Sequence, residues 1–235
     1  PRNYKSFHGN ISIENFNTNT YNLYYSNQLS KNISYCATLS KHYSDGFIKN
    51  KQIVNSEEFY LSNTNGRDEE LFKFKINVTT NNTISKLTFI HSTIDNNYDA
   101  WTPDNNGYMT YTDYRGNDYQ QTNAMSLYIK QSNKLFDLIS ITTYSDNDIN
   151  YSYDADWGNN EFWINPPYNF DNYYYGYYNP YNYTDFTNRK KINKSQEIRI
   201  VDKSYQNSTI TIGGIYSIFK ENDKRKRQAG DYSWW

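Results

Sequence analysis

Apolar and polar residues alternate with a period of two along much of the chain. Between Phe72 and Val78 every second residue is Phe, Ile or Val, and a Lys or Asn lies between each pair. This pattern is typical of a strand with one apolar face and one wet face. It predicts further strands at Ile33–Leu39, Phe47–Val54, Ile84–His91, Met125–Lys130, Leu135–Tyr144, Glu197–Val201 and Ser208–Phe219.

Glycines mark two expected changes of direction. The sequence Ser44-Asp45-Gly46 contains the Asp-Gly pair that favours tight hairpins, so it predicts a hairpin joining the strands on either side. Gly213-Gly214 interrupts the last predicted strand, and we expect a bulge or a bend there.

Helical periodicity is weak, and the best short candidates are Ser56–Leu61 and part of the first 25 residues, where Phe7 and Ile11 are four apart. The pattern therefore predicts a mainly β fold, an antiparallel β-sandwich with long Tyr/Asn-rich loops. We expect residues 1–30 to form a projecting N-terminal arm that mediates assembly contacts and could include a short helix. Residues 31–235 would form the sandwich body, with interface loops at 95–119 and 145–188.

The composition favours a folded chain that associates through polar contacts. Hydrophobic residues make up 36 % of the 235 residues and aromatic residues 19 %, while Asn contributes 35 residues and Tyr 27. Disordered chains lack such an aromatic content. The 24 basic and 25 acidic residues nearly cancel, and no stretch approaches the roughly 18 apolar residues of a membrane-spanning helix. We therefore expect neither DNA nor a membrane as a partner.

The side chains that usually carry catalysis or bind metals are few and scattered. His8, His42 and His91 lie in separate β-patterned segments without the spacing of a zinc site. Cys36 lies in an apolar alternating segment without a neighbouring His, which is typical of a buried inert thiol. No Ser/His/Asp arrangement is recognisable, so we predict a protein that is not an enzyme, with no metal site and no required cofactor.

One segment has some features of a calcium-binding loop. Calcium loops carry Gly at the sixth position and an acidic residue at the twelfth, where this chain has Tyr151 and Trp157. Turn-forming Asp and Asn residues explain the segment more simply. Its oxygen-bearing residues, at every second position, are Asp146, Asp148, Asn150, Ser152, Asp154 and Asp156.

The last residues combine charge and aromatic groups. Lys224–Arg227 is a run of four basic residues, which we interpret as a solvated tail beyond the last strand. Trp234 and Trp235 end the sequence as given, and two exposed indoles are unfavourable in water. We therefore expect this segment to dock against another surface.

Tyrosines are concentrated in the second long segment. A phenol is a large ring with a polar tip, so it suits tight but polar contacts, and it ionises with a pKa near 10. We hypothesise that these tyrosines make contacts between copies and act as an alkaline release switch, because near pH 11 the net charge would be of order −40. They are Tyr151, Tyr153, Tyr168, Tyr173, Tyr174, Tyr175, Tyr177, Tyr178, Tyr181 and Tyr183.

The N-terminal quarter of the chain resembles a known family. Tyr21–Leu29 leads into the predicted strand Ile33–Leu39, then into the turn His42–Gly46, and then into Phe47–Asn50. This order is similar to the N-terminal third of cypovirus polyhedrins, which have a chain of about this length. The residues of the family-like turn are Tyr43, Ser44, Asp45 and Gly46.

The resemblance implies a viral occlusion-body matrix protein. Members of that family form homotrimers of β-sandwich subunits that pack into crystals in the cytoplasm of infected host cells, where they embed and protect virus particles. The crystals dissolve at alkaline pH. Some members hold a nucleotide between subunits, but no nucleotide-binding residues of this chain can be assigned from the resemblance.

A second function remains open from the residues alone. A secreted carbohydrate-binding β-sandwich would use exposed indoles and phenols to stack against sugar rings. Trp101, Trp157 and Trp163 are the candidate side chains.

Overall fold

The computed structural model describes residues 5–54, 57–61, 63–98, 101–102, 104–170, 173–174, 177–178, 182–204, 208–229 and 232–234. It contains one helix of five residues among the described residues, and most of the other residues lie in strands. No helix in this described part has the length and apolar character needed to cross a membrane.

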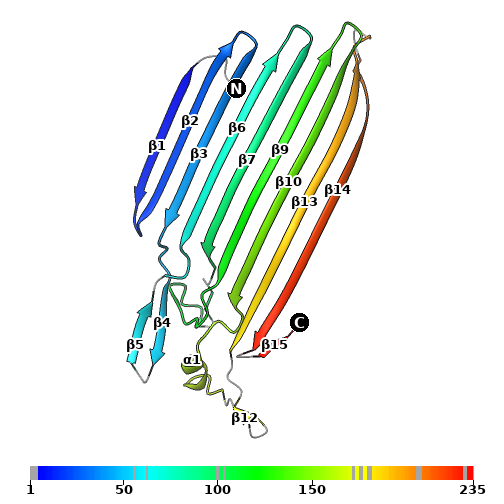
Figure 1. Ribbon diagram of the computed structural model, residues 1–235. Helices are drawn as coiled ribbons and strands as arrows, with labels where there is room; N and C mark the ends of the chain where they lie inside the picture. Colours follow the sequence, from blue (N-terminus) through cyan, green and yellow to red (C-terminus); the bar gives the residue numbers. More distant parts are fainter. Residues whose placement is uncertain are drawn as a thin grey trace.

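The dominant element is one large antiparallel sheet (Figure 1). The order of its strands across the sheet is the same as their order along the chain. Adjacent antiparallel strands need only short links, so local chain reversals explain this order. In spatial order its strands are β1 (Ser6–Glu14), β2 (Thr18–Ser30), β3 (Ile33–Ser44), β6 (Arg67–Thr79), β7 (Thr83–Asn97), β9 (Asn117–Ser132), β10 (Phe136–Asp154), β13 (Tyr183–Asp202), β14 (Ile210–Ala229) and β15 (Tyr232–Trp234).

Smaller elements gather beyond one end of this sheet (Figure 1). A second sheet has the order β5-β4-β8, and a third pairs β11 with β12. The only helix in the described residues, α1, begins after Asn159, whose side chain accepts a hydrogen bond from the Phe162 amide and caps the helix. These elements are β4 (Lys49–Val54), β5 (Glu57–Leu61), β8 (Met109–Thr110), α1 (Asn160–Ile164), β11 (Tyr173–Tyr174) and β12 (Tyr177–Tyr178).

The connections at the two ends of the sheet differ in length. Residues 31–32, 80–82, 133–135 and 203–209 link strands at one end, which we call the turn end. At the other end, the loop end, the long connections are 45–66, 98–116 and 155–182, and they contain all the smaller elements. Figure 1 shows this asymmetry, with tight turns at the top and the loops below.

The mainly β, antiparallel architecture predicted from the period-two pattern is confirmed. Every predicted strand coincides with an observed one, although the observed strands of the main sheet are longer. The main sheet is a single layer, and the small sheet lies beyond its loop end instead of over a face (Figure 1). A second layer, as in a sandwich, would therefore have to pack onto this sheet.

The two helix candidates were wrong. Residues 57–61 form β5, and the segment around Phe7 and Ile11 forms β1, which pairs with β2 along its whole length. A strand explains Phe7 and Ile11 equally well, because residues four apart also share one face of a strand. Residues 6–14 and 18–30 of the expected arm are thus strands at one edge of the main sheet.

The hairpin predicted at Asp45-Gly46 was also wrong. β3 pairs with β2 and β6, whereas β4 pairs with β5 and β8 in another sheet. Gly46 does turn the chain, with φ of 78°, and a Cβ there would lie 2.7 Å from the backbone carbon of Asn65. The turn is therefore real, but it leads the chain out of the main sheet.

Gly213-Gly214 does not produce a bulge, because the register between β13 and β14 runs without a shift. A Cβ on Gly213 would lie 2.6 Å from the carbonyl oxygen of Ile198, so close approach of the neighbouring strand explains the glycine there.

The basic run Lys224–Arg227, which we interpreted as a solvated tail, is part of β14.

The expected loops at 95–119 and 145–188 are shorter than predicted. β7 continues to Asn97 and β9 begins at Asn117, while β10 continues to Asp154 and β13 begins at Tyr183. Polar residues in these strand extensions hid their regular structure from the pattern analysis. The residues that resembled a calcium loop are mostly alternate residues of β10, so their spacing of two is the period of a strand.

Candidate functional site

The two faces of the main sheet have opposite character. Residues that pair directly across antiparallel strands lie on the same face, and successive residues alternate between faces. Leu127 pairs with Leu87 and Thr142, and Ser126 with Thr88 and Thr143. We call the face that carries Leu127 the band face and the face that carries Ser126 the polar face.

Exposed apolar side chains lie almost entirely on the band face. In the strands of the main sheet, every exposed large apolar side chain whose burial is described lies there, except Ile215 and Phe219. Four large apolar side chains of this face lie apart from the others, nearer the loop end: Tyr43, Tyr119, Phe186 and Ile192. We call the remaining large apolar side chains of this face the apolar band: Phe7, Ile11, Ile13, Tyr21, Leu23, Tyr25, Leu29, Ile33, Tyr35, Leu39, Phe72, Phe74, Ile76, Val78, Leu87, Phe89, Met125, Leu127, Ile129, Phe136, Leu138, Tyr144, Ile198, Ile200, Ile210, Ile212, Tyr216 and Ile218.

Nothing in the described chain buries this band. Across all residues whose burial is described, the buried apolar side chains are Cys36, Ile48 and Trp163, and none of them belongs to the band. The buried Cys36 confirms the expectation of a buried thiol. Monomeric soluble proteins rarely expose apolar surface on this scale, so such a face marks contact with another apolar surface.

The apolar band runs obliquely to the hydrogen-bonded rows of the sheet. The row that begins with the pair Leu23 and Leu39 reaches Asn123 on β9 and Asp146 on β10. Another row, through Ile212 on β14, reaches Gln131 on β9. Each of these two rows is apolar over part of the sheet and polar over the rest. The band therefore crosses the sheet at an angle to the hydrogen-bonded rows.

Charged pairs border the band towards the loop end. On the band face, Lys41 forms ion pairs with Asp68 and with Glu70 at 2.7 Å. Lys190 lies 3.8 Å from Asp146 and 3.6 Å from Asp148. On most strands the band face thus changes from apolar side chains nearer the turns to ionised side chains nearer the loops. Lys194 is an exception, because it lies within the band in register with Tyr144 and Ile218.

The polar face is crossed by hydrogen bonds between side chains. The Thr122 hydroxyl donates to Asn147 at 2.8 Å, and the hydroxyls of Thr143 and Ser195 are 2.5 Å apart. Such pairs satisfy small polar side chains on a sheet surface that water can reach.

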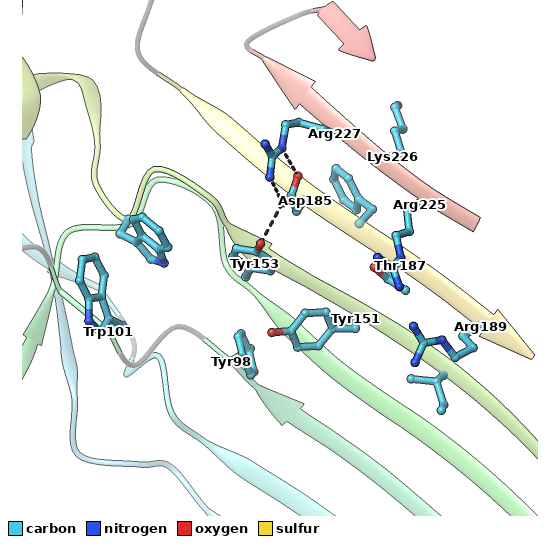
Figure 2. A pocket seen from close by; sticks show the side chains of 13 residues that line it. Tyr98, Trp101, Tyr151, Tyr153, Asp185, Thr187, Arg189, Arg225, Lys226 and Arg227 are labelled. Carbon is cyan, nitrogen blue, oxygen red and sulfur yellow. Dashed lines mark hydrogen bonds and ion pairs between the residues drawn. The ribbon is translucent and has the colours of Figure 1, made fainter. Parts of the chain in front are cut away.

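A cavity of about 1210 Å³ opens at the loop end, mainly on the polar face. Most of the residues that the sheet contributes lie on three adjacent strands, β10, β13 and β14, and the 98–116 and 155–182 loops contribute aromatic rings (Figure 2). We call this cavity the loop-end pocket. Its lining residues are Tyr98, Trp101, Ile149, Tyr151, Tyr153, Trp157, Asp185, Phe186, Thr187, Arg189, Arg225, Lys226 and Arg227.

Strand register places a row of polar groups across the pocket floor. Tyr153 pairs with Asp185, which pairs with Arg227. The Tyr153 hydroxyl donates to Asp185 at 2.8 Å, and the Arg227 guanidinium donates to both carboxylate oxygens of Asp185, at 2.6 and 2.5 Å. This two-point contact fixes the orientation of Arg227.

The next row brings two further arginines to the same floor. Arg225 lies in register with Thr187, and its guanidinium donates to Asp223 at 3.0 Å. Arg189 also donates to Asp223, at 3.0 Å. The Arg225 side chain remains 72 % exposed, so most of its donors are available to a ligand.

Aromatic rings form the opposite wall. Trp101 and Trp157 meet edge to face with ring centroids 4.5 Å apart, and both remain exposed. Tyr98 lies 4.4 Å from Tyr151, centroid to centroid. Figure 2 shows Tyr98 and Tyr151 between Trp101 on one side and the arginines on the other.

The pocket residues keep well-defined charge states near neutral pH. The hydrogen bond from Arg227 holds the pKa of Asp185 below its usual range. Burial and the hydrogen bond to Asp185 raise the pKa of Tyr153, and burial together with Tyr98 raises that of Tyr151. The carboxylate is therefore ionised and the phenols are neutral, and in one copy these two phenols ionise at a higher pH than free tyrosine.

The structure brings together only part of the predicted tyrosine cluster. Tyr151 and Tyr153 line the loop-end pocket, whereas Tyr168 packs against Phe162 and Trp163. The backbone amide of Tyr183 donates to Asp156. Backbone pairing joins Tyr173 to Tyr178 and Tyr174 to Tyr177. Tyr175 and Tyr181 lie outside the described residues.

The three tryptophans proposed for sugar stacking divide in the same way. Trp101 and Trp157 lie together in the loop-end pocket, but Trp163 is buried and its indole nitrogen donates to Asp156 at 3.1 Å. Trp163 therefore anchors the loop and does not face solvent.

The family-like turn has a structural role in this fold. Asn65 accepts hydrogen bonds from the amides of Phe47 and Ile48, both at 2.8 Å, and the Tyr43 hydroxyl donates to Asp45 at 2.7 Å.

Among the described residues, no group of three or more His, Cys, Asp or Glu side chains could hold a metal ion.

The pattern of apolar residues did not mark Asp185, Arg189, Arg225 and Arg227 as site residues. Arg225 and Arg227 were visible as part of a basic run, but the run was interpreted as a tail. Recognised as a strand, it would have placed both side chains on one face, because residues two apart in a strand share a face.

Models of known protein families and the curated proteins gave no match to this chain.

Proposed function

We propose that the main sheet spans a lipid bilayer, with the apolar band against the acyl chains and the polar face towards a water-filled interior. The protein would then form part of a membrane wall that admits polar solutes from the loop end. The oblique apolar band, whose side chains are exposed or half-buried on one face from β1 to β14, is the observation that carries the proposal.

The angle of the band is close to that of strands that cross a membrane. From β1 to β14 the centre of the band moves by about seven residues, roughly 23 Å along the strands, over strand spacings that total roughly 38 Å. These lengths give an angle of about 31°, and membrane-spanning strands tilt by about 35–45°. A planar bilayer would impose one tilted belt on all strands that cross it.

The height of the band is comparable on its longer strands. On β10 it extends from Phe136 to Tyr144, with Ser140 and Thr142 between them, roughly 26 Å along the strand and about 22 Å along the membrane normal at this tilt. On β7 it is limited to Leu87 and Phe89. The apolar belt of membrane-spanning sheets is about 25 Å tall. The charged pairs of Lys41 and Lys190 would then lie at the headgroup level.

The backbone also suits an apolar medium. In lipid, each unpaired amide or carbonyl costs several kcal/mol, and strand pairing within the sheet satisfies these groups. The proposal therefore requires that the outer edges of β1 and β14 pair with other strands. Short turns at one end and long loops at the other are typical of sheets in this environment.

This proposal departs from the expectation of no membrane partner. That expectation relied on the lack of a long apolar run, but in a strand only every second residue faces lipid. The occlusion-body function stays a prediction, supported by the polyhedrin resemblance and the tyrosine content. In that case a second copy would have to cover the band.

Labelled cysteines on adjacent residues distinguish these surroundings. In a Cys36→Ser background, Leu127→Cys places a fluorophore on the band face, and Ser126→Cys places one on the polar face of the same strand. After reconstitution into phosphatidylcholine vesicles, brominated lipid should quench the label at 127, and aqueous iodide should quench the label at 126.

Two results would contradict the membrane proposal. If brominated lipid quenches both labels equally or neither, the band does not face acyl chains. If the label at 127 is shielded from lipid and from iodide, and the protein sediments as an oligomer without lipid, a second copy covers the band, as self-assembly requires.

A further inference from the structure

The loop-end pocket has aromatic side chains on one side and cationic side chains on another, and the proposed function does not involve them. One wall offers the rings of Trp101, Trp157, Tyr98 and Tyr151, and the floor offers guanidinium groups (Figure 2). Only one aliphatic side chain, Ile149, lines the cavity. A purely apolar ligand would cover the guanidinium groups without offering their remaining donors an acceptor.

From this arrangement we infer that the pocket binds an acidic oligosaccharide. The C–H faces of sugar rings stack on exposed indole and phenol rings, which supply contact area at little entropic cost. A carboxylate or sulfate on the same chain accepts paired hydrogen bonds from a guanidinium. The volume of about 1210 Å³ exceeds the range of about 300–1,000 Å³ that is usual for small-molecule sites, which favours a ligand of several rings.

Arg225 is the side chain that selects for the acid group. Arg227 is engaged at two points by Asp185, and Arg189 is held by Asp223 and by Glu221 at 3.1 Å. Among the described residues, Arg225 donates only to Asp223, through Nε at 3.2 Å and Nη2 at 3.0 Å, and its side chain is the most exposed of the three. Arg189 and Arg227 add positive potential on either side of it.

The inference rests on the proposed function only in taking the polar face to be wet. The two can fail separately, because ligand binding is measured on detergent-solubilised protein and the lipid contact is measured by quenching in vesicles.

Calorimetric titration with trigalacturonate, which carries a carboxylate on each ring, tests the inference. Its methyl ester has the same rings without charge, and it should bind at least tenfold more weakly. Arg225→Gln should weaken trigalacturonate binding roughly 10- to 100-fold, as expected for losing a charge-assisted hydrogen bond, and should leave the methyl ester unaffected. Trp101→Ala should weaken both ligands by about tenfold, because both stack.

Arg199→Gln is the matched control. Arg199 also lies on the polar face and pairs with an acidic residue two positions away, Glu197, but it lies outside the pocket. This variant should bind trigalacturonate like the unmodified protein.

Three results would overturn the inference. One is no trigalacturonate binding, or equal binding of acid and ester. A second is equal loss in the Arg225→Gln and Arg199→Gln variants. The third is tighter binding of ATP than of trigalacturonate, which would make the pocket a site for nucleotide phosphates instead.

Discussion

Asp156 shows how one buried carboxyl organises the loop end. It is almost fully buried and accepts hydrogen bonds from the Gly158 amide and the Trp163 indole, both at 3.1 Å, and from the Tyr183 amide. These contacts tie the beginning of the 155–182 loop to α1 and to the start of β13. They also hold Trp157, one wall of the loop-end pocket, between two anchored residues.

The titration of Asp156 should make loop stability depend on pH. Burial raises its pKa to about 6, although hydrogen bonds oppose the shift, whereas an unfolded Asp has a pKa near 3.9. Because the folded pKa is the higher one, the stabilisation is complete below about pH 4 and is lost as pH rises through 6. The difference corresponds to about 3 kcal/mol at most.

Asp156→Asn should reduce this dependence. In urea unfolding of detergent-solubilised protein, the free energy of unfolding of the unmodified chain should fall between pH 4 and pH 7. The fall should be smaller in the variant, where Asp113, whose pKa burial also raises to about 6, still titrates. Parallel pH profiles for the two proteins would show that Asp156 is not the titrating group.

At the scale of one strand, β9 illustrates why the two faces can be tested separately. Met125, Leu127 and Ile129 lie on the band face, and Ser126 and Tyr128 alternate with them on the polar face. A one-residue step therefore moves a substitution from the apolar side to the wet side of the same strand, with the same backbone hydrogen bonds.

We expect Leu127→Arg to destabilise the membrane-inserted protein by about 2–4 kcal/mol, because it places a guanidinium near the middle of the apolar band. Ser126→Arg, on the polar face, should change the stability by much less. Urea unfolding in lipid vesicles measures both values. Equal losses in the two variants would mean that both faces meet the same surroundings.

The strands were also the part of the fold that pattern analysis predicted best. Phe72–Val78 was recognisable because it alternates strictly and contributes to the apolar band. Leu135–Tyr144 was recognisable from its apolar content, although Ser140 and Thr142 lie on the band face and Ile139 and Ile141 on the other. The extensions of β10 and β13 up to Asp154 and from Tyr183 were not recognised, because Asp, Asn, Ser, Thr and Tyr predominate there and the contrast in hydrophobicity is weak.

For the whole molecule, the asymmetry of the connections predicts a sidedness. If the strands cross a bilayer, the turn at 133–135 and the loop at 98–116 lie on opposite sides of it. In the Cys36→Ser background, Lys134→Cys and Asn106→Cys place one thiol at each end. A membrane-impermeant maleimide should label only one of them in sealed vesicles of uniform orientation, and both after permeabilisation.

Labelling of both thiols from the same side in sealed vesicles would rule out strands that cross the membrane. It would favour a sheet that lies on a surface or packs against another copy. This result is independent of the fluorescence quenching, which reports the surroundings of a single residue.

The site was less predictable than the strands because it depends on register. Tyr151 and Tyr153 were singled out for their abundance, and Trp101 and Trp157 for their ring size. Their partners Asp185 and Arg227 are 32 and 74 positions from Tyr153, and only the pairing of β10 with β13 and β14 brings these side chains into one row.

The sequence by itself determined the central parts of most strands, because the two-residue alternation of apolar side chains is local to each of them. It could not show that the apolar positions of successive strands form one tilted belt, since the tilt exists only once the register between strands is set. Tertiary structure alone decided that this belt has no covering layer in the described chain and that arginines and aromatic rings share a pocket behind it. Both facts depend on contacts between residues far apart in the sequence.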